Sequence, residues 1–270
     1  QTFKLTITQA DQTAWSAGSL VLTTNSFGKI RVALGDGGSG IDAYDDKMPT
    51  AWEETWGTAI GTGVDLISGV GTSSNIGWVS PKIAGITLSA AWAGANDGTI
   101  NNDKATSGGT GVGRGYDLML NVEPVSGWSF FVGGSETEQE GKSNTISFND
   151  KQEVVAGFTM ALGPVTAGYQ RTGEFGGKTA VSALDYYDNR SWAVSFNVND
   201  DLSVSYGELE STKKLTGSVK TAMEAESIQL AYTMGGASIK VADTTVDNAV
   251  YSTAGSSDIE GITLALSLAF

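Results

Sequence analysis

The acidic residues that could act on a solute or hold a cation are concentrated in one segment, residues 36–73. They are Asp36, Asp42, Asp45, Asp46, Glu53, Glu54 and Asp65, and Lys47 is the one basic residue among them. Carboxylates at this density could bind a hard cation such as Ca²⁺, for which Asp42, Asp45 and Asp46 are the candidate ligands. Alternatively, they could set the electric field along a path that solutes follow.

The absence of His and Cys removes most enzymatic and metal chemistry. Without these residue types there is no Ser-His-Asp triad, no cysteine nucleophile, no imidazole metal site and no disulfide framework. Carboxylate catalysis would remain, but Glu53 and Glu54 are adjacent in sequence and so lie side by side instead of facing each other across a cleft. We therefore expect no enzyme and no required cofactor. The net charge of −14 also argues against a nucleic-acid partner.

The elements that must position the acidic segment are β-strands, because apolar residues recur at every second position along most of the chain. At the C-terminus, Ile262, Leu264, Leu266, Leu268 and Phe270 alternate with small or polar residues. Patterns of this kind predict fourteen strands, at about 2–9, 17–24, 28–35, 74–80, 84–93, 115–123, 127–135, 152–162, 164–172, 187–198, 201–209, 222–234, 236–244 and 257–270.

The connections between these strands alternate between tight turns and long polar stretches, which is typical of an up-and-down β-barrel in an outer membrane. The long stretches are 94–113, 136–150, 173–185, 210–221 and 245–256. A soluble β-sandwich also alternates. Two features favour the barrel: the polar face of each strand is largely uncharged, and aromatic residues cluster near strand ends. We expect one barrel domain over residues 1–270.

Residues 36–73 form the one connection that breaks this rhythm, and loops of this length are usually functional. Their many apolar residues should not stay in water, so we expect the segment to fold back against the inside of the barrel wall. Pro49 and Gly57 mark the expected start and end of a short helix. Asp42, Asp45, Asp46, Glu53 and Glu54 would then project into the lumen. Lys4, Lys29 and Arg31 would face them from the wall. The alternative is a solvated external loop.

Three segments of the chain resemble the general porins of Gram-negative bacteria, in the style of the α-proteobacterial members. SLVLTTNSFGKIRVALGD (19–36) is similar to the hairpin before the porin constriction loop, and IDAYDD (41–46) to the start of that loop. SNIGWVSPKIAGITLSAAWAG (74–94) is similar to the hairpin that follows it. The terminal Phe270 matches the family's end signal for barrel assembly.

This resemblance implies a sixteen-stranded barrel that assembles as a homotrimer in the outer-membrane lipid and passes small hydrophilic solutes and ions by passive diffusion. It also implies that the inward loop forms the narrowest part of the pore. The five acids would lie on the loop side and the three bases on the wall side. Some relatives hold Ca²⁺ near this loop, which agrees with the candidate ligands named above.

The chain departs from the porin pattern because its long loop follows the third readable strand instead of the fifth. We expect that two N-terminal strands are missing from this sequence.

Other functions remain open. A substrate-specific channel would use Tyr44, Trp52 and Trp56 as a track for one solute. A non-channel surface or adhesion protein would use the long polar loops as partner sites.

Overall fold

The computed structural model describes residues 2–8, 17–57, 60–94, 112–139 and 149–268. Phe270, the predicted assembly signal, lies outside these residues. The strands are β1 (Thr2–Thr8), β2 (Ala17–Thr24), β3 (Gly28–Leu34), β4 (Asn75–Val79), β5 (Ile86–Ala93), β6 (Val112–Val122), β7 (Trp128–Gln139), β8 (Lys151–Leu162), β9 (Val165–Phe175), β10 (Leu184–Asn197), β11 (Leu202–Leu215), β12 (Thr221–Met234), β13 (Ala237–Asp247) and β14 (Ile259–Leu268). Three short 3₁₀ helices accompany them: η1 (Gly40–Tyr44), η2 (Ala249–Tyr251) and η3 (Gly255–Ser257).

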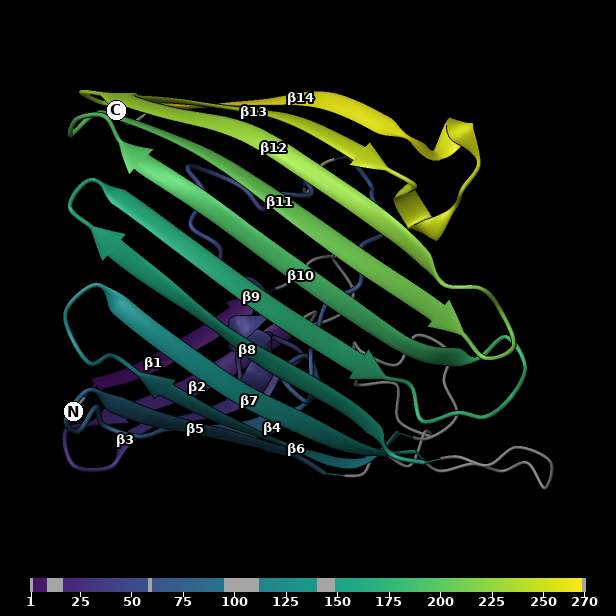
Figure 1. Cartoon of the computed structure of the whole chain (residues 1–270). Helices are drawn as coiled ribbons and strands as arrows, with labels where there is room; N and C mark the ends of the chain where they lie inside the picture. Colours follow the sequence, from purple (N-terminus) through teal and green to yellow (C-terminus); the bar gives the residue numbers. More distant parts are fainter. Residues whose placement is uncertain (1, 9–16, 58–59, 95–111, 140–148, 269–270) are drawn as a thin grey trace.

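All fourteen strands belong to one antiparallel sheet, and each strand pairs with its neighbours in sequence. The sheet curves into a wall around a central space, and the two ends of the chain lie at the same end of this wall but apart (Figure 1). The predicted all-β, up-and-down fold is therefore confirmed, strand by strand. The expected closure is not seen: among the described residues β1 pairs only with β2, and β14 only with β13.

The two faces of the sheet have the polarity of a membrane barrel and not that of a β-sandwich. On β14, Leu264 and Leu266 point outward and are 70% and 62% exposed. On the inner face, the carboxylates of Asp117 and Glu153 are fully buried. A sandwich would bury the leucines and expose the acids, whereas a strand between lipid and an aqueous lumen does the opposite. In the described part of the chain, no helix is long and apolar enough to cross a membrane.

Several strands run further than the sequence pattern predicts, always at the end of the sheet that carries the long loops. Strand β7 continues to Gln139, and β11 continues to Leu215. Both extensions are polar on both faces, for example Glu136 to Gln139. Hydrophobic alternation predicts only the part of a strand that faces lipid, so it misses a polar continuation that is held by main-chain pairing and by polar side-chain bonds such as that of Ser211.

Strand length differs sharply around the wall. Strands β1 to β5 have 5 to 8 residues, whereas β6 to β13 have 11 to 14. A tilted strand needs about 9–11 residues to cross a bilayer. The long strands meet this requirement. Strands β3 and β4, whose flanking residues are described on both sides, do not, and β1, β2 and β5 fall short of it within the described residues.

Candidate functional site: an inward loop and a basic pocket

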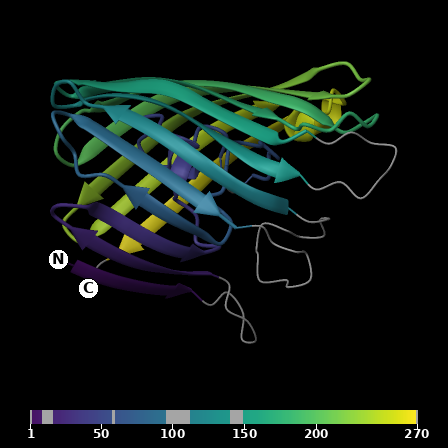
Figure 2. The same cartoon turned by 90° about the horizontal axis from the view of Figure 1, so that it is seen from below.

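The segment between β3 and β4, residues 35–74, lies against the inner face of the sheet and is called the inward loop here. Figures 1 and 2 both show η1, its first element, enclosed by the curved wall. The outgoing arm (36–57) crosses the wall from β3 toward β14, and the returning arm (60–74) comes back nearer the long-loop end. This placement confirms that the segment folds inward.

Asp117, in the middle of β6, holds both arms at the point where they leave the wall. Its Oδ2 accepts a hydrogen bond from the backbone N–H of Ile41 at 3.1 Å, and its Oδ1 accepts one from the N–H of Val70 at 3.0 Å. Gly40 and Gly69 allow this approach. A Cβ at Gly40 would lie 2.0 Å from the Asp117 carboxylate, and one at Gly69 would lie 2.5 Å from it. Both glycines also have positive φ, which other residues rarely adopt.

Glu153 on β8 fixes the returning arm in the same way. Its two carboxylate oxygens accept hydrogen bonds from the N–H groups of Ser68 and Gly69, each at 2.9 Å. Lys151 lies 3.4 Å from Glu153, so the buried negative charge has a cation beside it. A buried carboxylate needs such partners, because desolvation of an unpaired charge is costly.

Two glutamines hold the outgoing arm further along the wall. Gln170 on β9 accepts a bond from the N–H of Lys47 at 3.0 Å and donates to the carbonyls of Tyr44 and Asp45 at 2.9 and 2.7 Å. Gln229 on β12 accepts from the N–H groups of Trp52 and Glu53 at 3.0 Å and donates to the Glu53 carbonyl at 2.8 Å.

These anchors explain a correction to the sequence analysis: the helix expected from Pro49 to Gly57 does not form. That stretch consists of bends and turns, and the helical turn of the loop is η1, at Gly40–Tyr44. Within this stretch, the N–H groups of Ala51, Trp52 and Glu53 and the carbonyl of Glu53 are bonded to the side chains of Ser205 and Gln229. The wall satisfies these groups in place of the helix.

Two apolar clusters add to the polar anchors. Ile41 and Ile67, one from each arm, are buried against Met119, Phe131 and Val155 of the wall. Toward the far end, Trp56, Ile60 and Val64 pack against a second buried group that includes Leu209 and Met223. The apolar residues of the loop are therefore packing residues, and Trp56 is one of them.

The predicted acids Asp42, Asp45 and Asp46 lie on the outgoing arm, half-buried. Each is bonded to nearby backbone: Asp42 accepts from the N–H of Gly38, Asp45 from that of Asp46 at 2.8 Å, and Asp46 from that of Met48 at 2.8 Å. Burial raises the pKa of all three carboxyls. For Asp46, burial together with the nearby charges of Asp45 and Glu54 raises the pKa to about 6.

Glu53 and Glu54 lie near the far end of the outgoing arm and differ in exposure. Glu53 is 8% exposed, and its Oε1 accepts a hydrogen bond from the Thr263 hydroxyl on β14 at 2.5 Å. Glu54 is half-buried. The geometry thus makes Glu53 a contact between loop and wall, while Glu54 stays partly exposed.

The three predicted wall bases lie on the inner face of the short strands. Arg31 forms an ion pair with Asp36 at 2.5 Å and also donates to the hydroxyl of Ser39, so it fixes the root of the loop. Lys4 and Lys29 are exposed. Although burial acts against it, bonds from Ser19 and Arg31 and the charge of Arg31 lower the pKa of Asp36.

No three acidic side chains converge into a group that could hold a metal ion in the part of the chain that the structure describes. The Ca²⁺ prediction for Asp42, Asp45 and Asp46 therefore gains no support from the geometry.

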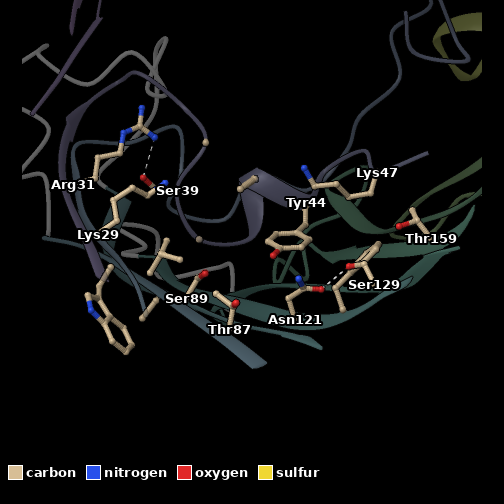
Figure 3. A pocket seen from close by; sticks show the side chains of 18 residues that line it. Lys29, Arg31, Ser39, Tyr44, Lys47, Thr87, Ser89, Asn121, Ser129 and Thr159 are labelled. Atoms are coloured by element: carbon tan, nitrogen blue, oxygen red, sulfur yellow. Dashed lines mark hydrogen bonds between the residues drawn. The ribbon is translucent and has the colours of Figure 1, made fainter. Parts of the chain in front are cut away.

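A cavity of about 400 Å³ lies between η1 and the wall, on the side of the loop that faces the tight turns. Lys29, Arg31 and Lys47 line it, with the aromatic ring of Tyr44 between them (Figure 3). Sequence reasoning named Lys47 only as the one base of the segment and assigned it to no site, because a single base among seven acids indicates local charge balance. It also missed Asp117, Glu153, Gln170 and Gln229, which are isolated polar residues in alternating strands and carry no motif.

Comparison with known proteins shows the fold but no family. No family model matches the sequence, and no curated protein matches it. Among solved structures, a porin refined at 1.8 Å aligns with a TM-score of 0.64 at 12% identity, over 94% of this chain and 81% of the porin. OmpF of Salmonella typhi aligns with a TM-score of 0.61 at 12% identity, covering 97% and 88% of the two chains. An anion-selective porin from Comamonas acidovorans aligns with a TM-score of 0.61 at 13% identity, covering 94% and 77%.

These structures are bacterial outer-membrane β-barrels, so the chain has a porin-like fold. The fold agrees with the expected outer-membrane location. At such low identity it carries no information on selectivity, assembly or the α-proteobacterial type.

Proposed function

We propose that residues 1–270 act as one barrel domain of a water-filled channel in the bacterial outer membrane, through which small hydrophilic solutes and ions diffuse passively. The observation that carries this proposal is the inward loop itself. It crosses the polar inner face and is held there by buried side chains of β6, β8, β9 and β12. A loop fixed in this way narrows a lumen without blocking it.

Selectivity in this proposal follows from the distribution of charge along the outgoing arm. Lys4, Lys29 and Arg31 lie where the arm leaves the wall, and Glu54 lies near its far end. Asp45 and Asp46 lie between them, beside Gln170. Separated opposite charges set up a field across the lumen that selects among ions. No catalytic group is part of this function.

We further propose that the channel is a homotrimer, with the short strands at the interface between copies. Strands of 5 and 7 residues, such as β4 and β3, cannot span the hydrocarbon layer, yet their outer faces are apolar. Leu20 and Val32, for example, point outward and are 38% and 49% exposed. Protein from a second copy would cover this part of the wall, whereas lipid would cover the long strands.

The direct test of channel function is single-channel recording in a planar lipid bilayer. We expect stable conductance steps that rise linearly with salt concentration. Purified protein that inserts into the bilayer and gives no steps would refute a channel and favour the surface or adhesion protein.

The assembly is tested by sedimentation in detergent, where we expect three copies of 28.0 kDa. A monomer would refute the trimer, and Val32→Arg should convert a trimer to monomers.

A substrate-specific channel is the second candidate, and the basic pocket is the observation that favours it. A general channel needs no side-chain pocket beside its constriction. Conductance that saturates with one class of solute would distinguish the two.

A further inference from the structure

The pocket beside η1 contains three cationic side chains and no carboxylate. Lys29 and Arg31 come from β3, and Lys47 comes from the outgoing arm. The chain as a whole carries a net charge of −14. Charged residues of the pocket lining that are all basic, in so acidic a protein, favour a local field of the opposite sign to the average, and a concave site focuses such a field.

The two lysines are the cations available to a solute. Arg31 is already committed to Asp36 at 2.5 Å, whereas Lys29 and Lys47 form no ion pair within 4.0 Å with any residue that the structure describes. Lys47 Nζ instead lies 5.2 Å from the centre of the Tyr44 ring. This cation–π contact holds the ammonium group over the pocket, while the carboxylates of Asp45 and Asp46 attract it without forming an ion pair within 4.0 Å.

The rest of the lining is rich in neutral hydrogen-bonding groups. Asn121, Ser129 and Thr159 project from β6, β7 and β8, and Thr87 and Ser89 project from β5 (Figure 3). The Asn121 amide and Ser129 hydroxyl bond to each other at 2.7 Å, so this pair is already oriented. Hydroxyl and amide groups both donate and accept, as solute hydroxyls also do.

We infer that this pocket is a subsite for small anions that also carry hydroxyl groups, the class that includes sugar phosphates and sugar acids. Lys29 and Lys47 attract the anionic group, while the hydroxyl and amide lining bonds the rest of the solute. The cavity of about 400 Å³ is in the size range of small-molecule sites. The inference rests on the proposed channel function and adds a substrate class to it.

The test is block of single-channel current in potassium chloride by three probes added separately: glucose 6-phosphate, glucose and inorganic phosphate. Glucose 6-phosphate should reduce the current at a concentration roughly tenfold or more below that needed for either other probe, because only it engages both parts of the pocket. The double variant Lys29→Gln/Lys47→Gln should raise its blocking concentration by roughly tenfold or more. Tyr44→Phe, which keeps the ring under Lys47, should change it less.

Lys240→Gln is the matched control, because Lys240 lies on β13, away from the pocket. It removes one positive charge, as each of the two pocket substitutions does, and should leave block by glucose 6-phosphate unchanged. Equal block by phosphate and glucose 6-phosphate would overturn the hydroxyl part of the inference. An equal rise in the blocking concentration of glucose 6-phosphate in the double variant and in Lys240→Gln would overturn the site. In each case the wild-type channel still conducts. A chain that forms no channel would instead refute the proposed function.

Discussion

Replacing Asp117 with Asn tests whether the inward loop is held by its backbone. Asp117 offers two carboxylate oxygens to two N–H groups, those of Ile41 and Val70. An Asn side chain of the same shape offers one oxygen and one NH₂ group. One of the two backbone donors would then face another donor in a site that is fully buried in the native protein.

The expected cost follows from that lost bond. A buried donor left without a partner costs about 1–3 kcal/mol. Since each 1.4 kcal/mol is a factor of ten, local opening of the loop should become about 5- to 150-fold more frequent. The strands keep their own main-chain pairing, so the cost should appear in the loop and not in the wall.

Amide hydrogen exchange of the protein in detergent measures this opening directly. We expect faster exchange at Ile41 and Val70 in Asp117→Asn and unchanged exchange in the centre of β10. Asp185→Asn is the matched control, because Asp185 is an exposed carboxylate paired with Lys214. Unchanged protection of Ile41 and Val70 in the Asp117 variant would show that the apolar clusters alone hold the loop, and our account of the anchors would be wrong.

Three further predictions concern the charges of the loop. Because burial raises the pKa of Asp46 to about 6, lowering the pH from 7 to 5 should protonate it and shift the reversal potential in a salt gradient toward anions, and Asp46→Asn should reduce this shift. The same raised pKa means that the folded state binds more protons than the unfolded state between about pH 4 and 6. The free energy of unfolding contributed by Asp46 is therefore highest at the acidic end of that window and falls as the pH rises. Neutralising Asp45, Asp46 and Glu54 together should shift the reversal potential toward anions at pH 7, whereas Glu53→Gln, at a buried contact with Thr263, should shift it less. Removing divalent cations with EDTA should leave the unfolding temperature unchanged, and a clear drop would support the predicted Ca²⁺ site.

The strands were predictable because each carries its own signal. In β14, Ile262, Leu264 and Leu266 repeat at intervals of two, and the pattern needs no knowledge of the neighbouring strand. The polar extension of β11 to Leu215 was not predictable, because it has no apolar alternation. Pairing with β10 and β12 and the buried bond between Ser211 and Asn189 keep it extended.

The site was predictable only in part, for a different physical reason. The inward position of the loop follows from its apolar residues, which must be buried somewhere. The residues that hold it are spread along the sequence: Asp117 bonds Val70 from 47 positions away, and Gln229 bonds Trp52 from 177 positions away. Such contacts depend on the register and curvature of the whole sheet, which a local pattern does not contain. The pocket around Lys47 depends on the same geometry.

The anchoring of the loop through main-chain atoms has a consequence for how this protein can change over generations. Asp117, Glu153, Gln170 and Gln229 recognise peptide groups of the loop and not its side chains. Apart from Gly69, which has no room for a side chain, the donor positions exclude only proline by their hydrogen bonding. Substitutions in the loop that alter its charge can therefore accumulate while the position of the loop stays fixed. A lineage carrying this scaffold could adapt to new nutrients or toxins one side chain at a time, without having to refold its outer wall.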